Sequence, residues 1–319
     1  MTSLMWWAAT VTLSSFAIVA MAASIAIALA APMLARRSAR YSPAARAAFL
    51  FRLRLVPTAC AVACAFGVAL PIFLYFEPSD SGERLAWTLM IAAVAGAVLL
   101  ARGFWRAAAG WMATRRLMRG WQARGRRLHT FDAPLPVFAI EESFPTVAVV
   151  GFSRPALFIA ERVLRECSVV EVRAMVRHEC AHVASRDNLK QFLIRACPDV
   201  LRPNSTIDRA WTSAAEEAAD ARAAGGDPAS ALALAEALIR VARLAPRVRA
   251  LEVASAFYLG GSIESRVRRL VEPSDSLPDP SRPLGCVIAC AGALAFAGTV
   301  ALAAPAIHQV MEAAVRFLP

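Results

Sequence analysis

The chain has 319 residues, of which 58 % are hydrophobic, and its mean hydropathy is +0.50. This apolar content exceeds that of an ordinary soluble domain, so the sequence predicts an integral membrane protein. A net charge of +11 is compatible with nucleic-acid binding, but the basic residues are concentrated beside hydrophobic runs, where they are typical of membrane orientation. We therefore expect the lipid bilayer, and no nucleic acid, to be the partner of these charges.

The first third of the chain contains three apolar runs. Leu4–Leu34 carries no charged residue and is long enough to cross a bilayer. Leu55–Phe76 and Leu85–Leu100 are expected to be the second and third spans. Residues 1–105 are therefore predicted to form three transmembrane helices joined by an arginine-rich loop.

The arginines indicate how these spans are oriented. The connection Glu77–Arg84, between the second and third spans, is mostly acidic, whereas arginine clusters follow the first and third spans. Since positively charged loops remain in the cytoplasm, we expect the N-terminus outside the cell and the central part of the chain at the inner face of the plasma membrane. A fourth span is predicted at Leu284–Ala304, so that residues 284–319 form this helix and a short external tail. The two clusters are Arg36, Arg37, Arg40, Arg46, Arg52 and Arg54, and Arg106, Arg115, Arg116, Arg119, Arg124, Arg126 and Arg127.

Residues 106–283 are predicted to form a cytoplasmic domain. It begins with a basic amphipathic segment, Gly110–Thr130, which we expect to lie on the bilayer surface against anionic head groups; an acidic substrate protein is the alternative partner. Pro136–Ile140, Thr146–Val150 and Ala156–Ala160 are short apolar or β-branched runs separated by Pro and Gly. They predict a small sheet in a fold that is otherwise mainly α-helical.

Residues 168–193 are predicted to form the central helix of this domain, because they open with capping-box spacing and continue with apolar residues at helical spacing. His178 and His182 are four residues apart, so both imidazoles project from one face and can reach a single Zn²⁺. Glu179 lies beside the first His, where it can act on a metal-bound water. This is the H-E-x-x-H arrangement of a zinc metallopeptidase. The same pattern also occurs as a solvated surface feature, and a third ligand decides between the two.

The third ligand is expected on an Ala-rich helix, Ile207–Ala224, which ends at a Gly pair. Glu216 and Asp220 are four residues apart on one face of it. Glu216 can complete a His-His-Glu set that leaves the fourth position to water, as catalytic zinc requires. Asp220 is placed to accept the other ring N–H of a ligand His, with His178 the best candidate. The alternative is that these acids form a solvated face.

Two segments carry a resemblance to a known family. VRHECAHVASRDNL (residues 176–189) and AAEEAADARAA (residues 214–224) resemble the BlaR/MecR-type integral membrane metallopeptidases, the signal transducers of β-lactam sensing and their sensorless relatives. The preceding stretch, residues 144–168, is similar to the strand pair of that family. The resemblance spans roughly residues 134–270.

The resemblance implies a gluzincin-like zinc peptidase domain with one Zn²⁺ per chain. Carried over position by position, it implies that His178, His182 and Glu216 bind zinc, that Glu179 is the general base and that Asp220 supports a ligand. Members of the family often carry an external penicillin-binding domain after the last span. The chain ends at Pro319, so we expect a sensorless member.

Three further residues have weaker assignments. Tyr258 could stabilise an oxyanion, since a phenol often does so in such sites, although an ordinary buried aromatic is the competing interpretation. Asp187 resembles an acid that the family carries after the second His, and we expect it to be structural or to support a ligand. Arg266 lies on a late helix of the family and is expected to tether the domain.

The expected function is that of a zinc metalloendopeptidase whose substrate is a cytoplasmic protein, with a transcriptional repressor as the candidate in transmembrane signalling. An exposed edge strand could hold such a substrate by main-chain hydrogen bonds. One alternative is an HtpX-like membrane protein quality-control or processing protease, which shares H-E-x-x-H. The other is a non-catalytic membrane scaffold, although a scaffold would have no need of Glu179. The sequence leaves the oligomeric state open.

Overall fold

A computed structural model of the protein describes residues 2–76, 87–142, 144–198, 200, 205–244 and 263–272. Within these ranges the fold is mainly helical with one small sheet, as the sequence predicts. The connection Glu77–Arg84, the predicted fourth span Leu284–Ala304 and the candidate Tyr258 lie outside the described residues.

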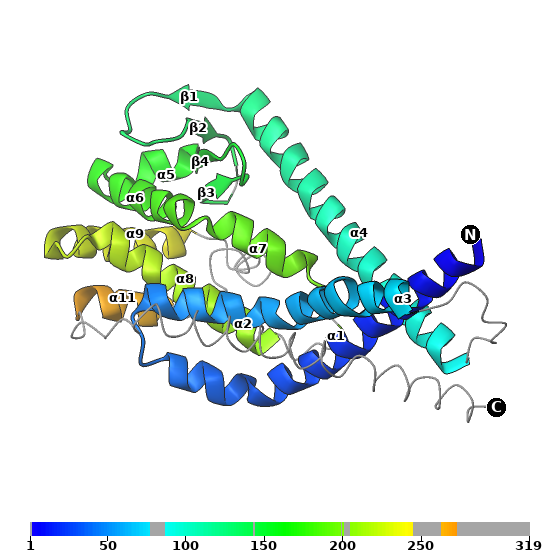
Figure 1. Cartoon of the computed structure of the whole chain (residues 1–319). Helices are drawn as coiled ribbons and strands as arrows, with labels where there is room; N and C mark the ends of the chain where they lie inside the picture. The colour runs from blue at the N-terminus through cyan, green and yellow to red at the C-terminus, as the bar shows by residue number, and fades with distance from the viewer. Residues whose placement is uncertain are drawn as a thin grey trace.

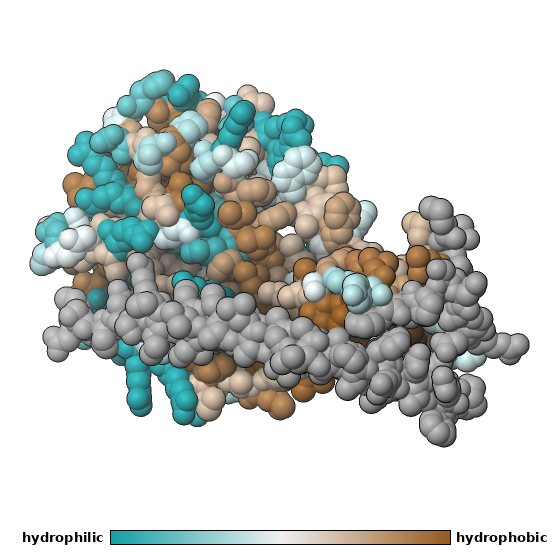
Figure 2. Space-filling view, viewed as in Figure 1, coloured by the Kyte–Doolittle hydropathy of each residue, from teal (hydrophilic) through white to brown (hydrophobic). Residues whose placement is uncertain are grey.

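Three helices are long and apolar enough to cross a membrane, which supports a multi-pass membrane protein. The first is α1 (Thr2–Ser38) and the last is α4 (Trp87–Arg124). The second is formed by α2 (Pro43–Cys64), a π-helical stretch (Ala65–Ala69) and α3 (Leu70–Phe76) in succession. Figure 2 shows apolar side chains over these helices and hydrophilic side chains gathered over the sheet and the helices beside it. Large apolar side chains exposed on the long helices include Ile18, Leu29, Phe66, Ile91, Val98 and Phe104.

The basic segment Gly110–Thr130 differs from its prediction. Its first 15 residues continue α4 without a break, and Arg126–Leu128 form strand β1. The 38 residues of α4 are about 57 Å long at the rise of an α-helix, roughly twice the thickness of the bilayer core. A surface helix would need a bend after the third span. Because the sequence between the span and Arg124 contains no proline and is rich in Ala and Arg, the helix runs on instead.

The sheet has four strands in the order β1-β2-β4-β3. Strands β2 (Val137–Ile140), β3 (Val147–Val150) and β4 (Ala156–Ala160) confirm the three predicted runs, whereas β1 was not predicted. β4 is buried along its whole length between β2, to which it is parallel, and β3, to which it is antiparallel. β3 is thus an edge strand, and the Val149 N–H on its outer side donates to the Glu179 carboxylate.

The helices stack below the sheet as seen in Figure 1. Residues of β2, β4 and α6 share one apolar core with Ala237 of α9, which fixes α6 under the sheet. The helices are α5 (Glu161–Glu166), α6 (Val169–Ser185), α7 (Asp187–Ala196), α8 (Ser205–Ala224), α9 (Pro228–Leu244) and α11 (Ile263–Val271).

The predicted helix over residues 168–193 is interrupted once. α6 ends at Ser185, and Arg186 takes a left-handed conformation, with φ 55° and ψ 37°, before α7 begins at Asp187. In an uninterrupted helix, Asp187 would lie about 140° around the axis from His182. The break instead brings its carboxylate to within 2.9 Å of the His182 ring.

The helix α8 packs against the membrane helix α2, and Figure 1 shows them side by side. The Arg54 side chain of α2 is only 2 % exposed, and its Nε donates to Asp208 Oδ1 of α8 at 2.8 Å. Arg46 lies two turns earlier on α2, with its Nη1 3.6 Å from Glu217 Oε2. We call this contact the α2–α8 interface. Its apolar part consists of Ala47, Leu50, Ile207, Trp211, Ala214 and Ala215, in a cluster that also includes Ala31 of α1 and Ile194.

Replacing Arg54 by Met is expected to destabilise the protein by about 1–3 kcal/mol, because the ion pair with Asp208 and the hydrogen bond to the Ile194 carbonyl are both lost. The measurement is the thermal unfolding midpoint of the full chain in detergent. Arg52→Met is the matched control, since Arg52 is exposed two residues away on the same helix. Equal midpoints for the two variants would show that the α2–α8 interface does not depend on Arg54.

Candidate metal centre

The three predicted ligands come together between α6 and α8. His178 Nε2 and His182 Nε2 are 3.2 Å apart. Glu216 Oε2 lies 3.4 Å from His178 Nε2, and Glu216 Oε1 lies 3.5 Å from His182 Nε2. Ligand atoms about 2.0–2.1 Å from a tetrahedral Zn²⁺ are separated by about 3.3–3.4 Å. The spacing of these side chains therefore matches a metal site, and the group could hold a metal ion.

Local sequence accounts for this placement. The capping box predicted at the start of α6 is present, with Ser168 Oγ accepting from the Glu171 N–H and the Glu171 carboxylate accepting from the Ser168 N–H. Once α6 is fixed, helical periodicity puts both His side chains on one face. Small residues allow α8 to approach, and the buried alanines include Ala181 of α6 and Ala219 of α8.

A carboxylate lies behind each imidazole. Asp220 Oδ1 is 2.9 Å from His178 Nδ1, which is the pairing expected from the sequence. Asp187 Oδ2 is 2.9 Å from His182 Nδ1. A carboxylate at Nδ1 favours the tautomer that carries its proton there, so the Nε2 lone pairs of both rings turn toward Glu216. Acceptor atoms thus face one another at the centre of the group, an arrangement that a cation stabilises.

The ionisation of these residues follows from their surroundings. Burial disfavours the imidazolium of His178, but Asp220 and Glu216 outweigh it and raise the pKa of His178 to about 10. Burial likewise opposes ionisation of Glu216, yet His178, His182 and Arg266 lower its pKa to about 2. The carboxylates that favour a proton on His178 would equally favour a metal ion in the place of that proton.

Acidic side chains near the metal group outnumber the basic side chains in contact with them by two. The carboxylates are Glu179, Glu216, Asp187 and Asp220, whereas the cationic side chains in contact with them are Arg266 and Lys190. If both imidazoles were neutral, as metal ligands are, the net charge of these side chains would be minus two. A divalent cation between the two His and Glu216 would balance it, so the residues fit the metal that their pattern predicts.

Glu179 lies at the junction of α6 and the edge strand. Its side chain is buried, and Oε2 accepts a hydrogen bond from the Val149 N–H of β3 at 3.0 Å. Burial raises the pKa of the Glu179 carboxyl, although His182 and His178 oppose the rise. The Asn188 side chain of α7 donates to the carbonyls of Val149 and Gly151, which holds β3 beside the group.

A small apolar cavity of about 30 Å³ adjoins His178 and Glu179. It opens between β3, α6 and α9, and its other lining residues are Val147, Met175, Leu234, Ala237, Leu238, Val241 and Arg266. Space next to Glu179 is therefore lined by aliphatic side chains, with room for about one methyl-sized group.

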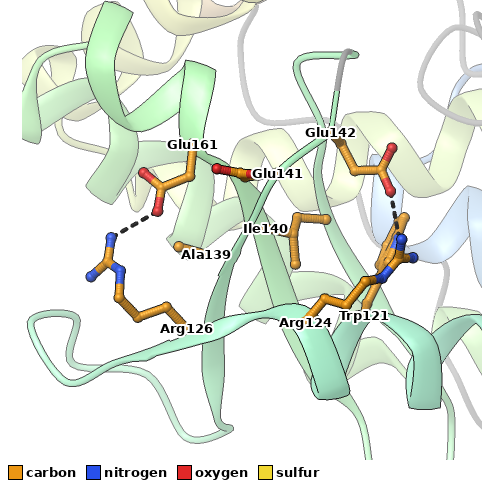
Figure 3. A pocket seen from close by; sticks show the side chains of 8 residues that line it. All are labelled: Trp121, Arg124, Arg126, Ala139, Ile140, Glu141, Glu142 and Glu161. Atoms are coloured by element: carbon orange, nitrogen blue, oxygen red, sulfur yellow. Dashed lines mark hydrogen bonds and ion pairs between the residues drawn. The ribbon is translucent and has the colours of Figure 1, made fainter.

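A larger cavity of about 320 Å³ lies at the opposite edge of the sheet (Figure 3). Three of its charged side chains are engaged with neighbours, because Arg126 pairs with Glu161 at 2.8 Å and Trp121 Nε1 donates to Glu142 Oε1 at 2.9 Å. The lining contains no His or Cys. The full lining is Trp121, Arg124, Arg126, Ala139, Ile140, Glu141, Glu142 and Glu161. We assign the functional site to the metal group and not to this cavity.

No protein-family model matches the chain, and a search of curated proteins finds no significant similarity. The functional argument therefore depends on the sequence motif and on the geometry of the metal group.

Proposed function

We propose that the protein is a zinc-dependent endopeptidase of the BlaR/MecR type, anchored by four membrane helices with its active site at the cytoplasmic face. The fourth helix is the run Leu284–Ala304. The observation that carries the proposal is the spacing of His178, His182 and Glu216, together with Glu179 on the same turn of α6. The arginine clusters beside the apolar runs support the orientation.

The chemistry divides between the metal and Glu179. A zinc ion held by His178, His182 and Glu216 would supply a Lewis acid for the scissile carbonyl and would lower the pKa of a water molecule toward about 7. Glu179 would accept a proton as general base and later deliver it to the leaving amine. The raised pKa of Glu179 supports this role, because a general base works best when its pKa approaches the operating pH.

The edge strand β3 is the surface that we propose for the substrate. The main-chain N–H and C=O of Val149 point away from β4, since both bond side chains of the helices. Val147, two residues earlier, presents its main chain to the same side and lines the small cavity beside Glu179. An extended peptide added here would replace Glu179 and Asn188 as the partners of the Val149 main chain and would pass beside the general base. Its recognition by main-chain hydrogen bonds would require little sequence specificity.

The proposed substrate is a cytoplasmic regulatory protein, for which a transcriptional repressor is the candidate that the resemblance implies. A small winged-helix repressor encoded beside this chain would support a signalling role. A proteolytic product found by comparing the cytosolic proteins of cells with and without the active chain would identify the target.

Zinc removal tests the proposal directly. The purified full chain in detergent is expected to contain one Zn²⁺, to cleave casein, to lose this activity on chelation and to regain it when zinc is restored. Metal content and cleavage are measured on the same samples. A chain that holds zinc but cleaves neither casein nor any protein of a cytosolic extract would be the scaffold considered above, and not a peptidase.

A further inference from the structure

Arg266 reaches the metal group from α11, a helix that carries none of the three candidate ligands. The side chain is 2 % exposed, and Nε and Nη2 each donate to one carboxylate oxygen of Asp220 at 2.7 Å. The remaining nitrogen, Nη1, lies 3.0 Å from Glu216 Oε2. One guanidinium therefore holds the predicted metal ligand Glu216 and the carboxylate that lies behind His178.

The guanidinium of Arg266 offsets the repulsion between two acidic side chains of α8. Glu216 and Asp220 lie one turn apart on one face, and both are buried against α6. Two ionised carboxylates at this spacing repel each other and are costly to bury without a partner. The planar, forked guanidinium of Arg266 satisfies both at once, which the single ammonium group of a lysine cannot do with the same geometry.

The contact also distinguishes the two oxygens of Glu216. Arg266 engages Oε2, which also lies 3.4 Å from His178 Nε2, whereas Oε1 lies 3.5 Å from His182 Nε2. Because Oε2 already accepts from Arg266, Oε1 is the better donor to a metal, and ligation through Oε1 alone would leave a coordination position open. Open coordination of this kind is what separates a catalytic zinc site from a structural one.

We propose that Arg266 is a positioning residue: it fixes the carboxylates of Glu216 and Asp220 before metal binds and restricts Glu216 to ligation through a single oxygen. Docking of α11 thereby sets the metal affinity of a group formed by α6 and α8. This inference rests on the proposed zinc site, and it extends that site to a helix that contributes no ligand.

The test compares Arg266→Lys and Arg266→Met with Arg268→Met in the full chain. Arg268 is the matched control because it lies on the same helix but is 69 % exposed and pairs with Glu264. Affinity for Zn²⁺ is measured by competition with a chelator, and the coordination of Co²⁺ in the same site is followed by its visible absorption spectrum. The unfolding midpoint of each metal-free variant is recorded.

Both Arg266 variants are expected to bind Zn²⁺ about 10–100-fold more weakly than the wild type, the range found when residues that orient metal ligands are removed. Their Co²⁺ spectra are expected to shift toward higher coordination as the second oxygen of Glu216 becomes available, whereas Arg268→Met matches the wild type in both measurements. Arg266→Lys keeps the charge, so it decides the question if Arg266→Met does not fold.

Wild-type affinity and an unchanged Co²⁺ spectrum in Arg266→Lys would overturn the inference while leaving the zinc peptidase standing. An unchanged spectrum with a lowered unfolding midpoint would also overturn it, because Arg266 would then only stabilise the fold. A wild-type chain that binds neither metal would overturn the inference and the proposed function together.

Discussion

Replacing Glu179 by Gln is expected to leave the metal content unchanged and to reduce peptide cleavage by about 10²–10⁴-fold, the usual contribution of a general base. Gln keeps the shape of the side chain but cannot take a proton. Glu179 is not one of the three converging ligands, and its carboxylate accepts a hydrogen bond from the Val149 N–H of the edge strand β3. The substitution therefore separates proton transfer from metal binding.

The measurement combines zinc content with casein cleavage and with a comparison of the cytosolic proteins in cells that express each variant. Glu161→Gln is a suitable control, because this glutamate pairs with Arg126 at the far edge of the sheet. If the Glu179 variant cleaved as fast as the wild type, the mechanism proposed here would be wrong, whatever the metal content.

Replacing His178 by Ala is expected to remove the metal itself. The substitution deletes one of three protein ligands and leaves Asp220 without the imidazole beside it. We expect the affinity for Zn²⁺ to fall by more than about 100-fold, beyond the loss caused by removing a residue that only orients a ligand. Zinc bound per chain after dialysis, determined by elemental analysis, measures the effect.

His129→Ala is the control for this loss, because His129 is an exposed imidazole outside the metal group. It should retain the zinc content of the wild type. Equal zinc in the two variants would mean that the metal binds elsewhere on the chain and that the convergence of His178, His182 and Glu216 has another cause.

Much of the candidate site could be predicted because its determinants are local. The spacing of His178 and His182 fixes their common face as soon as a helix forms, and the capping box fixes where that helix begins. The same holds for Glu216 and Asp220 on α8. The three apolar strand runs were located for the same reason, since each is bounded by Pro or Gly.

Two contacts that complete the site do not follow from helical spacing, although the resemblance singles out both Asp187 and Arg266. Arg186 adopts a left-handed conformation that is uncommon for residues other than Gly, so nothing marked the break that turns Asp187 toward His182. Arg266 is 46 positions from Asp220. One signal was nevertheless available, because Arg266 lies three residues after Ile263 and four before Leu270, on the apolar face of α11.

Two features of the fold were missed for a different reason. β1 is a short strand of exposed, mostly charged residues. Its sequence shows no apolar strand pattern, and it is a strand because it pairs with β2. The sequence did not predict that α4 continues past the third apolar run, because its arginines are equally typical of a helix on the lipid surface and of one that projects away from the membrane.

Because of the α2–α8 interface, residues from the predicted membrane part, 1–105, pack directly against residues of the predicted domain that follows. Trp211 and Ala214, five and two residues before the candidate metal ligand Glu216, are buried in the same cluster as Leu50 of a candidate membrane span. A fragment cut free of the first two helices would expose that apolar stripe to water and lose the arginine partners of Asp208 and Glu217 on α2. The candidate membrane helix α2 thus supports the helix that carries Glu216, and we expect the smallest unit that keeps the metal group intact to include it.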